Sequence, residues 1–170
     1  MTRALKMRSF LDENEDRTAL ELARQLMKSK DRAARLEVVA VLGWLGRRAL
    51  PELTEMLADR DNFVQTLAQN NWSVAFDALS TDKEKAAAIR DAVGVLGDDP
   101  SVNEFLIKLC GLQSDSALST LEEIIVGYNG KAASTQAKAM FEHLAGEPWS
   151  SLGRTQKLSE LEKRKSEGKL

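Results

Sequence analysis

The stretch LPELTEMLADRDNFVQ, at residues 50–65, constrains the fold more than any other part of the chain. A short apolar helix is predicted to begin at Leu50-Pro51 and to end at an Asp-x-Asp turn, after which a second apolar helix begins at Phe63. A weaker copy lies 30 positions upstream, where Asp31 matches Asp61. Self-similarity at a spacing of about 20 to 50 residues is typical of stacked helical repeats. The chain is therefore predicted to be all-α.

Composition supports a helical, water-soluble protein. Of the 170 residues, 43% are hydrophobic and 29% are charged, and only 3 are proline, which favours a folded chain rich in helix. No apolar run approaches the roughly 18 residues of a membrane span, and the opening MTRALKMRSF lacks the apolar segment of a secretory signal. We therefore expect no membrane contact and a cytoplasmic location by default; secretion stays open if a signal has been removed.

Charge is distributed unevenly along the chain. Residues 1–50 carry 11 basic and 7 acidic side chains, residues 51–127 carry 5 and 14, and residues 128–170 carry 8 and 5. Nucleic-acid binding needs clustered Lys and Arg, so the acidic centre argues against a nucleic-acid groove there. Ordinary solvated helix faces are the simpler explanation of the same charges.

Apolar spacing and turn residues divide the chain into helices separated by short turns. Residues 12–16 are predicted to form an acidic loop. Beyond residue 148 the pattern weakens, and we expect a domain at 1–148 followed by a capping segment and charged tail at 149–170. The predicted helices cover residues 2–11, 18–27, 36–45, 50–58, 63–79, 82–96, 102–110, 115–128, 131–144 and, as a fraying surface helix, 155–165.

Several side chains are assigned to the core by their spacing. Leu22 and Leu26 fall on one helical stripe, and Trp44 and Trp72 lie within predicted repeat helices. Asn71 shares the stripe of Trp72, which is unusual for an amide. A buried amide needs hydrogen-bond partners, so Asn71 either bonds to a neighbouring helix or marks a functional surface.

No residue pattern specifies a chemistry. Cys110 is the single cysteine and lies on an apolar face, where a thiol usually acts as a small hydrophobe rather than a nucleophile. His143 is the single histidine and is predicted to face solvent, since no nucleophile motif accompanies it. One His and one Cys do not make an ordinary zinc site. The sequence therefore predicts no enzyme, no metal and no cofactor.

The residues of the repeated stretch resemble a known family. The run Leu50-Pro51-x-Leu53-x3-Leu57-Ala58-Asp59-x-Asp61-x2-Val64 is similar to the HEAT repeat, which implies a right-handed α-solenoid of about four helical hairpins. In that family a turn aspartate and a following arginine often pair between successive repeats. Arg35 keeps this basic position, whereas Gln65 replaces it one repeat later, which weakens the expected ladder.

The resemblance also implies where a partner binds. The helices that precede each turn, at 18–27, 50–58, 82–96 and 115–128, would line the concave face. Trp149 is either an end cap or an exposed anchor for a partner. The polar residues expected to point outward from these helices are Arg24, Lys28, Glu52, Glu55, Arg90, Glu122 and Glu123.

The function predicted is a non-enzymatic HEAT-like scaffold, of bacterial type, that binds a protein partner possibly carrying basic segments. Three alternatives remain: a HEAT-like enzyme resembling DNA glycosylases, one resembling bilin lyases, or a non-catalytic domain of a larger protein. The acidic centre disfavours the glycosylase, which needs a basic groove. The sequence leaves the oligomeric state and the identity of the partner open.

Overall fold

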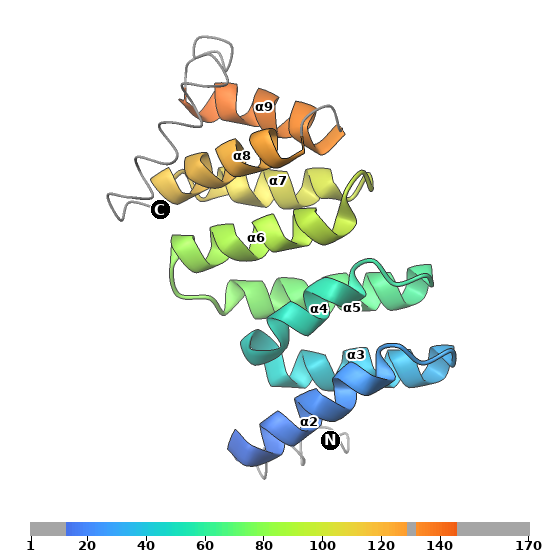
Figure 1. Ribbon diagram of the computed structural model, residues 1–170. Coiled ribbons are helices and arrows are strands. Elements are labelled where there is room, and N and C mark those ends of the chain that lie inside the picture. The colour runs from blue at the N-terminus through green and yellow to red at the C-terminus, as the bar shows by residue number, and fades with distance from the viewer. Residues whose placement is uncertain (1–12, 129–131, 146–170) are drawn as a thin grey trace. The chain divides into compact units, whose positions relative to one another are not determined.

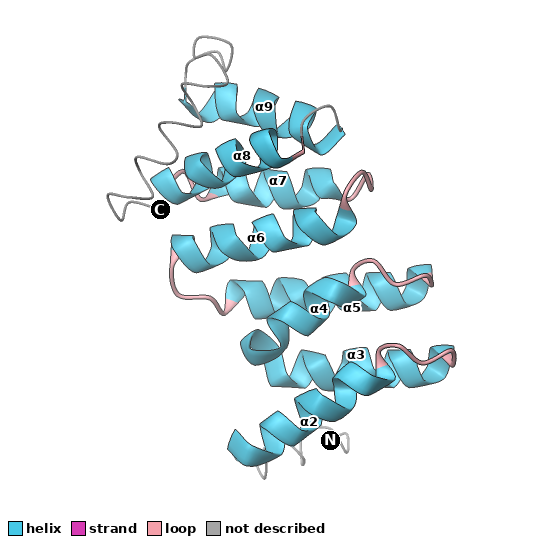
Figure 2. Ribbon diagram, in the orientation of Figure 1, coloured by secondary structure: helices cyan, strands magenta, loops and turns pink. Residues whose placement is uncertain are grey.

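The computed structural model describes residues 13–128 and 132–145, and within these residues all regular structure is helical (Figures 1 and 2). The helices pair into four hairpins, α2/α3, α4/α5, α6/α7 and α8/α9. The all-α class and the repeated hairpins are thus confirmed. The helices are α2 (Glu13–Leu26), α3 (Arg32–Leu45), a 3-10 turn η1 (Gly46–Ala49), α4 (Leu50–Met56), α5 (Asn62–Asp77), α6 (Asp82–Leu96), α7 (Val102–Gly111), α8 (Asp115–Gly127) and α9 (Ala132–Ala145).

Capping residues fix where the helices begin. The carboxylate of Asp31 accepts the backbone N–H of Ala33 at 2.9 Å at the start of α3. Asp61 accepts two backbone N–H groups at the start of α5. Thr81 and Glu84 bond to each other's backbone and form a capping box on α6. These bonds satisfy N–H groups that have no partner within the helix.

Two glycines fix where helices end. Gly46 after α3 and Gly97 after α6 have φ of 59° and 63°, a left-handed conformation that a side chain disfavours. No helix among the described residues is both long enough and apolar enough to cross a membrane.

The described helices form two compact units that divide between Leu79 and Ser80. In unit 1, α3 packs along α5, while α2 and α4 lie on one side of them (Figure 1). The ion pairs Asp16–Arg48 and Arg24–Glu52 tie α2 to η1 and α4. The core of this unit includes Val39, Leu42, Leu53, Val64 and Trp72, all fully buried.

In unit 2, α6 packs against α8 and α7 against α9, so that the first helices and the second helices of the two hairpins form two layers. The core between them includes Ile89, Val93, Leu106, Leu121 and Ile124. The expectation of one domain over residues 1–148 stays a prediction.

Two bonds show how side chains fit between the helices of unit 1. The Asn71 amide on α5 donates to the carbonyl oxygen of Val39 at 2.9 Å, and it occupies the space that a side chain at Gly43 would need. The Trp72 indole donates to the Thr54 hydroxyl at 2.9 Å. Asn71 therefore has the structural role that was one of its two predicted alternatives.

Three expectations need correction, and one lies outside what the structure describes. Residues 13–16 form the first turn of α2 rather than a loop, because negative charge is favoured at a helix N-terminus. Leu22 and Leu26 are 56% and 39% exposed, since Ala23 and Met27 face the core in their place. Trp44 is 37% exposed, whereas Trp72 is buried as predicted. The helices predicted at 2–11 and 155–165 lie outside the described residues.

Candidate functional site

Two of the predicted site residues of unit 1, Arg24 and Glu52, are joined by an ion pair between successive hairpins. Arg24 on α2 donates from Nε to Oε1 of Glu52 on α4 at 2.8 Å. The expectation that Glu52 points outward is wrong, because the residue is only 3% exposed on the side of α4 that Arg24 reaches. Its Oε2 has no hydrogen-bond partner among the described residues. Glu52 is therefore an internal counter-charge for Arg24 and offers no surface to a partner.

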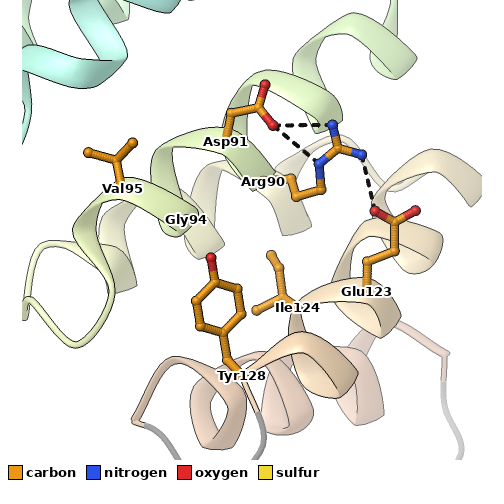
Figure 3. A pocket seen from close by; sticks show the side chains of 7 residues that line it. All are labelled: Arg90, Asp91, Gly94, Val95, Glu123, Ile124 and Tyr128. Atoms are coloured by element: carbon orange, nitrogen blue, oxygen red, sulfur yellow. Dashed lines mark hydrogen bonds and ion pairs between the residues drawn. The ribbon is translucent and has the colours of Figure 1, made fainter.

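In unit 2 the predicted site residues Arg90 and Glu123 form the same kind of link. Arg90 on α6 donates from Nη1 to Glu123 on α8 at 3.1 Å, and it also bonds to its neighbour Asp91 (Figure 3). Burial by itself would lower the pKa of Arg90, but the hydrogen bonds and charges of Glu123 and Asp91 outweigh burial and raise it. Arg90 is thus a permanent cation held between two carboxylates.

An open groove of about 430 Å³ lies beside this ion pair, between α6 and α8. Its polar side is the Arg90 cluster, and its apolar side consists of Val95 and the ring of Tyr128, beside the buried Ile124 (Figure 3). Gly94 makes room for Tyr128, because a Cβ added there would lie 3.0 Å from the phenol oxygen. The complete lining is Arg90, Asp91, Gly94, Val95, Glu123, Ile124 and Tyr128.

The groove carries an excess of negative charge. Asp91 and Glu123 face a single cation, Arg90, and that cation bonds to one oxygen of each carboxylate. Side-chain exposures of 62% for Asp91 and 25% for Glu123 leave both carboxylates open to solvent. The lining is therefore acidic on one side and apolar on the other.

A second hollow of about 300 Å³ lies in unit 1 beside the turns. Its polar groups already serve the fold: Arg35 pairs with Asp59 at 2.8 Å, and Arg60 donates to the carbonyl oxygens of Ser29 and Lys30. The resemblance implied this pairing of arginine and turn aspartate between repeats. We therefore assign this hollow to the joint between the two hairpins of unit 1.

The other predicted site residues differ in their placement. Glu55 and Lys28 are exposed as expected, on the rim of the unit 1 hollow. Glu122 is half-buried on α8, next to Glu123. Trp149 lies outside the described residues.

The residues considered for chemistry occupy ordinary positions. His143 is exposed, as predicted. Cys110 is half-buried, and burial raises the pKa of its thiol, which disfavours the reactive thiolate. In residues 13–128 and 132–145, no three His, Cys, Asp or Glu side chains gather as metal ligands would.

Sequence reasoning found Arg90 and Glu123 but missed the rest of the groove. Asp91 and Val95 are four residues apart on α6 and share a helix face. Ile124 lies on α8, and Tyr128, four residues later, directly follows the last residue of that helix. That spacing was visible in the sequence. The resemblance also implied that the helices at 82–96 and 115–128 line one face. Which of their side chains meet there was not visible.

One comparison with known proteins supports the repeat architecture. Residues 3–71 match the family model described as HEAT repeats. The helical hairpins continue beyond this match through α9. No curated protein matches the chain, and no solved structure does. Over residues 3–71 the chain is therefore similar to the HEAT repeats.

Proposed function

We propose that this chain is a non-enzymatic scaffold that binds a protein partner in the groove between α6 and α8. HEAT repeats generally serve as scaffolds for protein interactions, which supports a binding role. The observation that carries the proposal is the groove itself, which joins an apolar wall to a pair of open carboxylates. Protein interfaces combine these two surface types, with charge setting orientation and rate of association.

The charge of the chain supports a protein rather than a nucleic acid as partner. The groove lies within residues 51–127, which carry 14 acidic and 5 basic side chains. A polyanion would be repelled by this segment, whereas a partner with basic groups would be attracted.

Site-specific photo-crosslinking tests the proposal. A benzophenone amino acid replaces Val95 in the groove, or Ile107 on α7 in the same unit as the control; both positions are exposed, at 38% and 55%. We expect one protein to be captured at position 95 and not at 107. The same protein, once purified, should then bind the unmodified chain and bind Glu123→Lys more weakly.

Equal capture from both positions, or unchanged affinity of the purified protein for Glu123→Lys, would contradict the proposal. Circular dichroism of the Glu123→Lys chain should show an unchanged helix content, since Glu123 is not part of the core.

A further inference from the structure

We infer that the partner presents an arginine, flanked by aliphatic side chains, to the groove between α6 and α8. The inference rests on the proposed function and names the chemistry of the segment that binds. Its first support is charge: the groove holds Asp91 and Glu123 against one internal cation, Arg90, so an incoming cation would balance the cluster.

The geometry of Arg90 favours arginine over lysine in the partner. The Arg90 guanidinium reaches Asp91 from Nε and Nη2, at 3.2 and 3.1 Å, and Glu123 from Nη1, at 3.1 Å. One planar guanidinium is thus wide enough to span both carboxylates. A second guanidinium can use the carboxylate oxygens that Arg90 leaves, whereas an ammonium is a point charge with a shorter reach between acceptors.

The apolar wall accounts for the flanking aliphatic side chains. Val95 is 38% exposed, and Tyr128 lies across the end of the groove with its hydroxyl toward Gly94 (Figure 3). Methylene groups of an arginine stem, and a branched neighbour, bury apolar area against these residues. The tyrosine ring also favours a cation that lies over its face.

Short labelled peptides test the inference directly against the full chain. The probe has a central Val-Arg-Leu in an uncharged Gly/Ser sequence with blocked ends. Matched peptides replace the arginine with citrulline, which keeps the shape and removes the charge, or with lysine, or replace both aliphatic residues with serine. Fluorescence anisotropy measures the dissociation constants at low and moderate salt.

We expect the citrulline peptide to bind about tenfold more weakly or worse, since it loses the charge-assisted hydrogen bonds. The dissociation constants of the lysine peptide and of the serine-flanked peptide should each lie between those of the arginine and citrulline peptides. Asp91→Asn and Glu123→Gln should each weaken the arginine peptide by about tenfold. Asp98→Asn is the matched control, because Asp98 is an exposed carboxylate of the same unit outside the groove.

Equal binding of the arginine and citrulline peptides, equal loss in Asp98→Asn, or no saturable binding up to about 1 mM overturns the inference. Tighter peptide binding after removal of residues 146–170 would show that the chain's own end fills the groove and would overturn a partner as occupant. If the chain self-associates and Glu123→Gln abolishes this association, a second copy of the chain occupies the groove. That result would also overturn a partner as occupant.

The two proposals fail separately. If a protein crosslinks at position 95 but binds equally well after its arginines are replaced, the interaction stands and the arginine assignment falls. If the arginine peptide binds as expected but no protein is captured at position 95, the chemistry of the groove stands and the scaffold role falls.

Discussion

Arg35 is a buried arginine whose three guanidinium nitrogens all donate hydrogen bonds. It donates to both oxygens of Asp59, at 2.8 and 3.2 Å, and to the carbonyl oxygen of Ser29 at 2.9 Å, and it is 3% exposed. Arg35→Ala would leave the Asp59 carboxylate buried without its counter-charge. We expect a loss of about 3–5 kcal/mol in the free energy of unfolding, measured by urea denaturation.

Arg32→Ala is the control for this change. Arg32 pairs with Asp61 at 2.9 Å, but its side chain is 56% exposed, so its removal should cost about 1 kcal/mol or less. Similar losses for the two variants would mean that burial does not determine the strength of the Arg35 pair.

Gly43 is the second residue at which a small change should have a large effect. A Cβ there would lie 2.6 Å from the Asn71 side chain, so Gly43→Ala forces Asn71 away from its bond to Val39. We expect Gly43→Ala to destabilise the chain by about 1–3 kcal/mol, although alanine normally stabilises a helix by about 1 kcal/mol.

Gly111→Ala provides the comparison, because nothing lies within 4 Å of a Cβ at that position in α7. Thermal unfolding of both variants measures the difference, and Gly111→Ala should be neutral or stabilising. A stabilised Gly43→Ala chain would contradict the close contact with Asn71.

At the scale of helices, Asp61 couples the stability of α5 to pH. Burial works to raise the pKa of its carboxyl, but the N–H of Val64, the bond and charge of Arg32 and the N–H of Phe63 together hold it below the ordinary 3.8. A depressed pKa stabilises the folded chain above about pH 3.8, and the contribution is lost as pH falls through the lower, folded value.

Asp61→Asn tests this coupling, since asparagine caps a helix about as well as aspartate but does not ionise. The stability advantage of the unchanged chain over Asp61→Asn should be constant near pH 6 and shrink below about pH 4. Unfolding curves recorded across this range measure the difference. An advantage that persists to the lowest pH would refute the role of the ionised carboxylate.

The two cross-repeat ion pairs join equivalent helices but differ in burial. Glu52 has a side chain 4% exposed, whereas Glu123 is 25% exposed. Arg24→Ala should therefore destabilise unit 1 by roughly 2–4 kcal/mol, because it leaves a buried charge, while Arg90→Ala should cost unit 2 less than about 1 kcal/mol. Adding Glu52→Gln to Arg24→Ala should restore part of the loss. Equal effects of the two arginine changes, measured by urea denaturation, would contradict this reasoning.

The helices were predictable from the sequence because their signals are local. Asp31, Asp61 and Thr81 cap helices that begin next to them, and Gly46 and Gly97 end helices. Contacts between helices depend on packing, which no local pattern specifies. An exposed Glu52 follows from the resemblance, which puts its helix on the concave face, whereas its burial follows from the approach of Arg24 on another helix. For the same reason the sequence predicted Arg90 and Glu123 but not the other residues that line the groove.

At the scale of the whole molecule, each unit has a buried core of its own, Leu53 and Trp72 in one and Ile89 and Leu121 in the other. In repeat proteins, stability is approximately the sum of contributions from each repeat and its neighbours. We therefore expect residues 1–79 produced alone to keep a helical circular dichroism spectrum and to unfold cooperatively. A chain of residues 1–79 that remains unfolded would contradict this expectation.

The fit of Gly43 to Asn71 also bears on how sequences of this type change over evolutionary time. A larger residue at position 43 fits only if the residue at position 71 is smaller than asparagine. The carbonyl oxygen of Val39 then loses its hydrogen-bond donor. Related sequences should therefore show correlated replacement at the two positions, with glycine accompanying asparagine and alanine accompanying a smaller side chain.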